Sequence, residues 1–286
     1  MPVPDRKSDS DRKGGLVKRT HGAHAVVTGA GSGIGRAIAA ELVRRGSRVV
    51  CADIDLEAAE ETAKSLENAV AIACDVSSVD EVAELASQSR SWLGREPDLV
   101  VNNAGIGAGG KPVGESPLSD WQRTLGVNLW GVIHGCHTFV PAMRAAKAGG
   151  VINVASAAGF TAAPRMAAYN VSKAGVVSLS ETLAAELSGT GVAVTVLCPT
   201  FVRTNIFDGE LIDAEARGLA RRVSDVVGFS AEKVARMTLD AHDRGRLYVV
   251  PQPDAQLLWH AKRFVPVPYT RIAGLLGRFL PAEKEK

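Results

Sequence analysis

The amino-acid sequence predicts an α/β fold in which a doubly wound parallel sheet forms a single domain with helices on both faces. Two observations predict it. Between residues 24 and 250, short segments that are apolar throughout alternate with longer segments of helical periodicity, which is typical of parallel strands buried on both faces. The same stretch contains no linker and no internal repeat, so we expect right-handed crossovers to join all strands into one sheet.

The predicted strands are rich in β-branched and other apolar residues. They cover residues 24–29, 47–53, 69–75, 97–105, 149–156, 191–199 and 246–250. The predicted helices between them repeat apolar residues at helical spacing. They cover residues 33–46, 56–68, 79–94, about 119–147, 165–188 and 230–244.

Composition argues against several classes of function. The 33 basic and 31 acidic side chains nearly cancel, so charge gives no sign of a nucleic-acid partner. The four cysteines are far apart and form no CxxC pair, so we expect buried thiols in a reducing compartment. His134 and His137 have no third ligand nearby in the sequence, so we expect no metal site.

The N-terminal segment has no apolar core of the kind that a secretory signal needs. No run of about 18 apolar residues predicts a transmembrane helix either. We interpret residues 1–22 as a flexible polar tail and residues 23–250 as one folded domain, and we expect a cytoplasmic protein.

A glycine-rich turn, TGAGSGIG at 28–35, follows the first strand. It has the spacing GxxxGxG and not GxGxxG. Glycines allow the tight turn and let a dinucleotide pyrophosphate approach the backbone at a helix N-terminus. The residues expected to contact the cofactor here are Gly29, Gly31, Ser32, Gly33, Ile34 and Gly35.

The second strand ends at Asp53, 18 residues after Gly35. A carboxylate there accepts hydrogen bonds from the adenosine ribose and repels a 2′-phosphate, since a close pair of like charges costs about 4 kcal/mol at an effective dielectric near 20. The next residue is Ile54 and not a basic one, so NAD is favoured over NADP. The alternative is that Asp53 only caps the following helix.

The ends of the third and fourth strands also point to the cofactor. Asp75 and Val76 are expected near the adenine, and Asn102, Ala104 and Gly105 beside the cofactor. For Asn102 the alternative is turn formation alone.

These motifs together closely resemble the short-chain dehydrogenase/reductase family of the compact single-domain type. They are TGAGSGIG, Asp53, NNAG at 102–105, Asn128 in VNLWG, Ser156 in NVAS and YNVSK at 169–173, in family order over about residues 22–250. The resemblance implies a Rossmann-like fold, a homodimer or homotetramer, and hydride transfer between a nicotinamide and a secondary alcohol or ketone.

The resemblance offers Tyr169 as the general acid/base. A free phenol has a pKa near 10 and is a poor base at neutral pH. Lys173 lies one helical turn further on the same face, and its charge favours the phenolate. We therefore expect Lys173 to lower the pKa of Tyr169 and to hold the nicotinamide ribose.

Two further catalytic roles follow from the resemblance. Ser156 would polarise the substrate oxygen, and Asn128 would hold a helix distortion and a water in a proton relay to Lys173. The alternatives are an ordinary strand-end serine and a simple helix hydrogen bond. After the sixth strand, Pro199, Val202 and Thr204 fit cofactor positions, whereas Thr200 replaces the family's usual glycine.

We expect an apolar, bulky substrate of sterol-like, terpenoid or long-chain type. The residues expected to contact it are Ser156, Ala158, Phe160, Met166, Tyr169, Phe201 and Phe207. One alternative is that the apolar residues after Phe201 only pack a lid. Another is an acyl thioester of coenzyme A, met by Arg203, Arg217, Arg221 and Arg222. A non-catalytic nucleotide-binding regulator on the same fold is a third, although the catalytic set is present.

Residues 251–286 form a proline-rich and basic extension beyond the family domain. Its apolar residues Ile272, Leu275, Leu276, Phe279 and Leu280 fall on one helical stripe. We expect a short amphipathic helix that packs on this chain or a neighbouring subunit. The alternatives are weak contact with a membrane surface through residues 270–280 and disorder.

Overall fold

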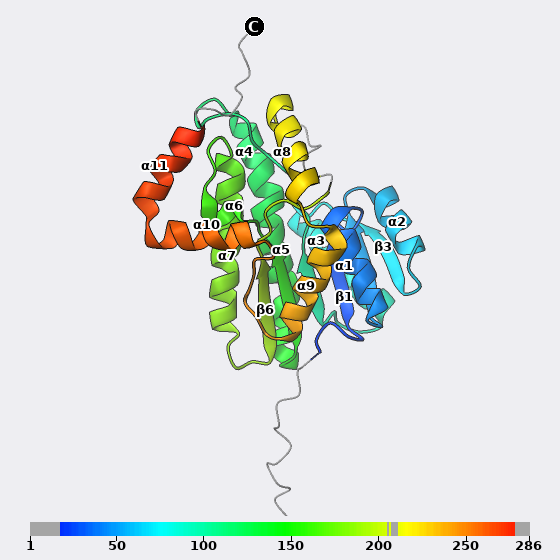
Figure 1. The fold of residues 1–286 in the computed structure, drawn as a ribbon. Helices are drawn as coiled ribbons and strands as arrows, with labels where there is room; N and C mark the ends of the chain where they lie inside the picture. Colours follow the sequence, from blue (N-terminus) through cyan, green and yellow to red (C-terminus); the bar gives the residue numbers. More distant parts are fainter. Residues whose placement is uncertain (1–17, 205, 207–210, 278–286) are drawn as a thin grey trace, which may run out of the picture.

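A seven-stranded parallel sheet in the order β3-β2-β1-β4-β5-β6-β7 forms the centre of the molecule (Figure 1). The structure, a computed structural model, describes residues 18–204, 206 and 211–277. The strands are β1 (His24–Thr28), β2 (Arg48–Asp53), β3 (Ala69–Ala73), β4 (Leu99–Asn102), β5 (Gly149–Val154), β6 (Val192–Leu197) and β7 (Tyr248–Val249). The strand order reverses between β1 and β4, which confirms the predicted doubly wound fold.

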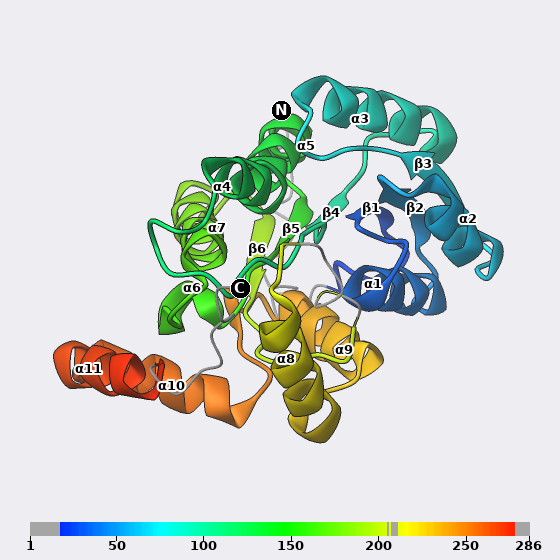
Figure 2. The ribbon, with the colours of Figure 1, turned by 90° about the horizontal axis from the view of Figure 1, so that it is seen from above.

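Helices cover both faces of the sheet (Figure 2). One face carries α3 (Val79–Leu93), α4 (Leu118–Leu125), α5 (Gly131–Ala146) and α7 (Ala167–Glu186). The other carries α1 (Gly33–Arg44) and α9 (Ala231–Asp243), and α2 (Leu56–Lys64) packs beside β2 and β3. The bounds of these elements lie close to the predicted ones, except that α2 ends four residues before the predicted end.

The core divides into two clusters, one on each face of the sheet. Successive strand residues point to opposite faces, so in β1 Val26 packs against α3 and α5, whereas Val27 packs against α1 and α9. Both neighbours along the strand are fully buried. This is why the strands are apolar throughout and do not alternate with polar residues.

The helix predicted over about 119–147 is interrupted in its first half by a π-helical turn, Gly126–Trp130. Asn128 lies in this turn and is fully buried. Its side chain accepts a hydrogen bond from the Ile106 backbone N–H at 2.8 Å and donates one to the Ile106 carbonyl at 2.9 Å. The turn therefore ties the helix to the loop that follows β4.

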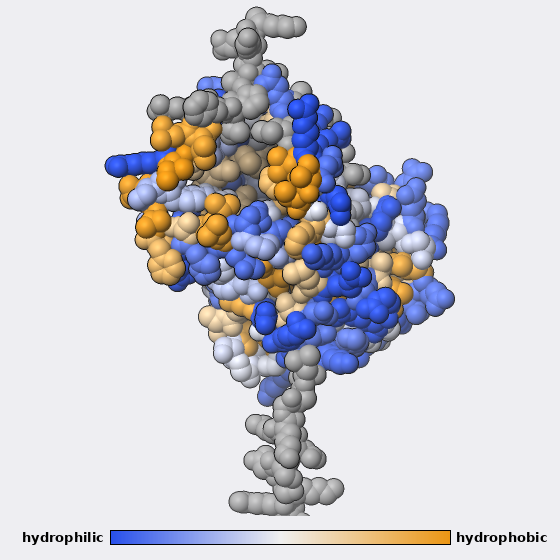
Figure 3. Space-filling model, in the orientation of Figure 1, coloured by the Kyte–Doolittle hydropathy of each residue, from blue (hydrophilic) through white to orange (hydrophobic). Residues whose placement is uncertain are grey.

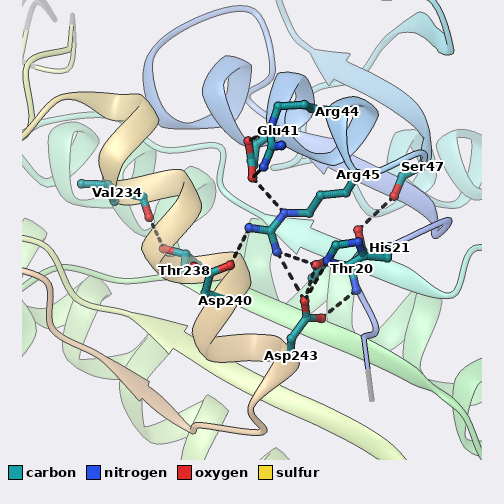
Figure 4. Close-up of polar contacts among 10 residues, drawn as sticks. All are labelled: Thr20, His21, Glu41, Arg44, Arg45, Ser47, Val234, Thr238, Asp240 and Asp243. Carbon is teal, nitrogen blue, oxygen red and sulfur yellow. Dashed lines mark hydrogen bonds and ion pairs between the residues drawn. The ribbon is translucent and has the colours of Figure 1, made fainter. Parts of the chain in front are cut away.

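The chain enters the domain through a buried ionic network (Figure 4). Thr20 is fully buried, and its backbone N–H and hydroxyl donate to Asp243 of α9 at 2.9 and 2.8 Å. Arg45, just after α1, donates to Glu41, Asp240 and Asp243 at 2.9, 2.7 and 3.3 Å. Thr20 lies inside the stretch predicted as a tail, so the packed domain begins by this residue.

Four further helices of the described chain lie on the substrate side, and of these only the last overlaps a predicted helix, the short one expected in the C-terminal extension. They are α6 (Ala158–Thr161), α8 (Ala214–Val227), α10 (Pro253–Phe264) and α11 (Pro266–Gly277). The last two lie in the extension for which one short helix was expected. Of the stripe predicted there, Ile272, Leu275 and Leu276 are in α11, whereas Phe279 and Leu280 lie outside the described residues.

The sequence also led to expectations about the cysteines, a metal site and a membrane-spanning helix. Cys51, Cys74, Cys136 and Cys198 are buried free thiols. His134 donates its Nδ1–H to the Val76 carbonyl at 2.9 Å. In the described part of the chain, no cluster of potential metal ligands occurs, and none of its helices is both long and apolar enough to cross a membrane.

Candidate active site

The glycine turn between β1 and α1 leaves no room for side chains. A Cβ on Gly35 would lie 2.1 Å from the Gly29 carbonyl oxygen, and Gly29 itself has a φ of +64°. Ser32 precedes α1 without capping it through its side chain, and the first turn holds no acidic residue. The backbone N–H groups at this helix end are therefore directed at an open anion site.

The Asp53 side chain, at the end of β2, contacts the glycine turn. Its Oδ2 accepts the Gly31 N–H at 2.8 Å and its Oδ1 accepts the Asp55 N–H at 3.1 Å. The cap of α2 is Asp55, which accepts the Ala58 N–H at 3.1 Å. This overturns the alternative that Asp53 itself caps that helix. A cavity of about 410 Å³ adjoins Asp53, and its lining consists of Gly31, Ser32, Gly33, Arg36, Asp53, Asp55 and Ala58.

The residues predicted at the ends of β3 and β4 lie in different surroundings. The Asp75 carboxylate accepts the N–H and hydroxyl of Ser77 at 2.9 and 2.7 Å. Asn102 is buried and donates to Asn153 at 2.9 Å. Neither of them, nor Val76, lines the cavities on this side of the sheet. Asn102 is therefore a link between β4 and β5.

Three predicted catalytic side chains converge beyond the end of β5. Ser156 follows that strand, and Tyr169 and Lys173 lie one turn apart in α7, all three buried. Ser156 hydrogen-bonds Tyr169, and its Oγ also lies 3.2 Å from the Ala158 N–H. Lys173 Nζ donates to the Val154 carbonyl at 2.9 Å and lies 5.8 Å from the Tyr169 ring centroid.

Asn128 is near this group but does not line the cavity. Its side chain is used by Ile106 and by Ser172, whose Oγ lies 3.4 Å from the Asn128 Nδ2. A Cβ on Gly105 would lie 3.2 Å from Asn128 Oδ1 and 3.4 Å from Lys173 Nζ. Asn128 thus lies near Gly105 and Lys173 without being part of the cavity lining.

One cavity of about 660 Å³ joins the glycine turn to the Tyr169 group. Its lining includes most of the predicted site: Gly29, Ser32, Gly33, Ile34, Asp53, Gly105, Ser156, Ala158, Met166, Tyr169, Lys173, Pro199, Phe201, Val202 and Thr204. Three predicted cofactor residues, Ile54, Gly35 and Ala104, are not among the lining residues, and Ile54 is 72% exposed. Phe207 is outside the described residues.

Comparison with known proteins agrees with this arrangement. Residues 23–213 match the family model described as short chain dehydrogenase. The chain belongs to the short-chain dehydrogenase family.

Individual members of the family are similar over most of the chain. A short-chain dehydrogenase/reductase from Burkholderia phymatum, solved in complex with NAD, has a TM-score of 0.80 and 33% identity, covering 94% of this chain and 99% of its own. The 1-deoxy-11-beta-hydroxypentalenate dehydrogenase of Streptomyces exfoliatus is 35% identical, with 82% of this chain and 84% of the relative covered.

One relative is much longer than this chain. The "Probable oxidoreductase EphD" of Mycobacterium tuberculosis is 34% identical over 255 residues, which cover 84% of this chain and 43% of the relative. The chain therefore spans less than half the length of that relative.

The ionisable pair Tyr169 and Lys173 differs from the expectation. Burial raises the pKa of Tyr169, and the hydrogen bond with Ser156 lowers it only in part. Burial also lowers the pKa of Lys173 to about 8. In this structure the effect of burial on the phenol therefore prevails, and Lys173 Nζ donates its hydrogen bond to the Val154 carbonyl.

One predicted substrate residue faces another way. Phe160 does not line the cavity. Its ring stacks on Trp259 of α10, with centroids 5.4 Å apart. The Phe160 side chain therefore packs against α10 and is not part of the cavity wall.

Several residues that line the cavity were not predicted. Asn103 donates to the Thr28 and Gly29 carbonyls at 2.8 and 3.1 Å, which joins β4 to the glycine turn. Residues 107–110 line the cavity, and Asp254 and Leu258 reach it from α10. The NN pair and the run GIGAGG were visible signals, but nothing in the sequence pointed to α10.

Proposed function

We propose that this protein is an NAD-dependent oxidoreductase that interconverts a secondary alcohol and a ketone on an apolar substrate. The observation that carries the proposal is the single cavity of about 660 Å³ that holds the glycine turn at one end and Ser156, Tyr169 and Lys173 at the other. A dinucleotide in that space would bring its reactive ring to the side chains that handle protons.

The residues present fit a dinucleotide. The two cavities share Ser32, Gly33 and Asp53, so a continuous space runs from the Asp53 carboxylate to Tyr169. The uncapped start of α1 would hold the pyrophosphate, and Asp53 would accept from the ribose and repel a 2′-phosphate. When bound, the nicotinamide supplies the hydride acceptor or donor.

The catalytic side chains would handle the substrate oxygen and its proton. Ser156 would donate a hydrogen bond to that oxygen, and Tyr169 would give or take the proton there. Lys173 has three N–H groups and uses one for Val154, so two are left for ribose hydroxyls. A phenol with a raised pKa is protonated at neutral pH, which favours ketone reduction there and alcohol oxidation at higher pH.

The cavity lining supports an apolar substrate. The wall over Tyr169 contains Ala163, Pro164, Met166, Phe201, Ile206, Ile212 and Leu258. The arginines considered for an acyl thioester of coenzyme A, Arg203, Arg217, Arg221 and Arg222, are not among the lining residues of the described chain, and Arg165 is the one arginine that is. An apolar alcohol is therefore favoured over the thioester, and the assembled Ser156–Tyr169–Lys173 group favours an enzyme over a nucleotide-binding regulator.

The test is formation of reduced cofactor from NAD and, in parallel, from NADP. The alcohols offered would be hydroxysteroids, terpene alcohols, long-chain 2-alkanols and 3-hydroxyacyl thioesters. We expect turnover with NAD on one of the first three classes. Activity confined to the thioesters would favour the alternative substrate, and NADH binding without turnover of any class would favour the regulator.

A further inference from the structure

The C-terminal arm, residues 253–277 in α10 and α11, carries an unusual share of exposed apolar side chains. Of the 17 large apolar side chains that are exposed in the described chain, eight lie in this arm. They are Leu257, Leu258, Phe264, Val265, Val267, Ile272, Leu275 and Leu276, with exposed fractions of 37–77%. Figure 3 shows apolar residues gathered over α11, whereas the region over α1 and α9 is polar.

The arm is fixed to the body along its other side. Ala255 is fully buried, and Trp259 packs between Phe160 and Tyr248, with centroids 5.4 and 5.0 Å away. Tyr269 of α11 donates its hydroxyl to the Thr161 carbonyl of α6 at 3.0 Å. These contacts hold the apolar face outward, and both views place α10 and α11 at one side of the molecule beside α6 (Figures 1 and 2).

The charge of the arm is mainly basic, with Asp254 at its start as the one acidic residue among 253–277. From Ala255 to Ala282 the sequence contains no aspartate or glutamate, but it contains Lys262, Arg263, Arg271 and Arg278. Several exposed apolar residues elsewhere have acidic neighbours in the chain, as Val226 has in Asp225. An apolar face bordered mainly by basic side chains is complementary to a surface that is both apolar and anionic.

The arm also borders the main cavity. Leu258 and Asp254 of α10 line the same space as Tyr169 and Met166. One side of α10 therefore forms a wall of the cavity, and residues on its other side, such as Leu257 and Phe264, are 70% and 77% exposed. Whatever covers the exposed face lies next to the point where an apolar substrate would enter.

We propose that the arm binds an anionic lipid surface through its apolar face, so that the cavity opens next to the membrane. This goes beyond the proposed function, because it concerns where the protein works and not what it catalyses. A second copy of the chain is a poorer occupant. A two-fold contact through this face would set its basic residues against their own copies, and Asp254, the one acidic residue among 253–277, is too few to pair them.

The test is co-sedimentation of the full chain with vesicles of phosphatidylglycerol and phosphatidylcholine, compared with phosphatidylcholine alone. We expect binding to the anionic vesicles. The variant Ile272→Glu/Leu275→Glu/Leu276→Glu should lose binding by at least about tenfold. Lys262→Gln/Arg263→Gln/Arg271→Gln should lose roughly fivefold for each charge. The control Val79→Glu, at a 47% exposed position of α3, should bind as the unmodified chain does.

Three results would overturn the proposal. One is that the chain stays in the supernatant with both vesicle types. Another is that the variant Ile272→Glu/Leu275→Glu/Leu276→Glu binds anionic vesicles as well as the unmodified chain does, with thermal unfolding also unchanged. The third is that the variant alters the oligomeric mass while neither protein binds vesicles, which would make the face a subunit interface. Sedimentation needs no substrate or cofactor, so failure here is distinct from failure of the proposed oxidoreductase.

Discussion

The two ends of the main cavity differ in what supports them. At the cofactor end, backbone atoms and glycines fix the geometry: Gly35 packs against the Gly29 carbonyl, and Asp53 accepts the Gly31 N–H. At the substrate end, side chains from distant segments form the wall, with Met166 before α7 and Leu258 in α10. The first end tolerates almost no change of residue type, whereas the second is adjustable.

The difference suggests a division of roles. A turn that is built from backbone contacts presents the same donors whatever the surrounding side chains are, which suits a cofactor of fixed shape. A wall that depends on packing, such as Trp259 between Phe160 and Tyr248, changes shape with each substitution. Substrate choice is therefore expected to depend on α6, α10 and the segment around Phe201.

The largest effect is expected at Lys173, where the two ends meet. Lys173→Met should reduce turnover by about a hundred- to a thousandfold. It should also stabilise the protein at pH 7, because a buried lysine whose pKa falls from 10.5 to about 8 costs about 3 kcal/mol of unfolding free energy. Loss of the hydrogen bond to Val154 offsets about 1–2 kcal/mol of that gain.

The pH dependence of this gain identifies its cause. The folded pKa is depressed, so the penalty is full below about pH 8 and disappears as the pH rises toward 10.5. The advantage of Lys173→Met should therefore shrink by about 2 kcal/mol between pH 7 and 9.5, measured by urea denaturation. Lys64→Met, at an exposed lysine paired with Glu60, should leave stability nearly unchanged at both pH values. A gain that does not vary with pH would exclude a desolvated ammonium.

At the cofactor end, adding a single methyl group to a glycine should be enough to weaken NADH binding. Gly35→Ala places a Cβ against the Gly29 carbonyl and should weaken NADH binding roughly a hundredfold, with a loss of about 1–3 kcal/mol in unfolding free energy. Gly218→Ala in α8 has open space around it and should keep NADH affinity unchanged. Fluorescence titration of NADH compares the two. Equal affinities would mean that the turn is not rigid.

The charge at the end of β2 should control the choice between cofactors. Asp53→Ala should reduce the preference for NAD over NADP by about tenfold or more, because it removes the repulsion of a 2′-phosphate. Asp75→Asn is the matched control, since Asp75 bonds Ser77 and lines neither cavity. The ratio of kcat/KM with the two cofactors measures both variants. A shift with Asp75→Asn but not with Asp53→Ala would reverse the assignment.

The smallest effect is expected at the substrate wall. Trp259→Ala removes two aromatic contacts that contribute about 0.5–1.5 kcal/mol each and should raise KM for the apolar alcohol about three- to tenfold. NADH affinity should stay unchanged. Phe264→Ala, at a 77% exposed position of the same helix, should leave KM unchanged. A parallel loss of NADH affinity in Trp259→Ala would show that the two ends are not independent.

Much of the fold and of the cofactor end could be predicted from the sequence because the signals are local. Apolar runs mark buried strands, and the glycine spacing and Asp53 lie within one strand–helix–strand unit. The π-helical turn at Asn128 could not be located from the apolar pattern, since it depends on a contact with Ile106, 22 residues away. Asn102 and Asn103 could not be told apart, because only packing decides which side chain turns toward the cavity.

The substrate end was predicted less well, because its wall depends on long-range contacts. Phe160 was assigned to the substrate, but it stacks on a tryptophan from a segment that seemed to lie outside the domain. Asp254 and Leu258 gave no signal, since nothing local indicates that α10 returns to the cavity. The pKa of Tyr169 was expected to fall, because the sequence shows the spacing to Lys173 but not the burial that desolvates both groups.

The central claim is that Tyr169 transfers the proton in an NAD-dependent oxidoreductase. The most direct measurement compares Tyr169→Phe with Tyr248→Phe, at a tyrosine that bonds Glu181 and lies outside the cavity lining, on whichever alcohol the panel identifies. The account predicts that Tyr169→Phe lowers kcat by at least about a hundredfold with unchanged NADH affinity, and that Tyr248→Phe keeps its turnover. Full turnover in Tyr169→Phe would contradict it.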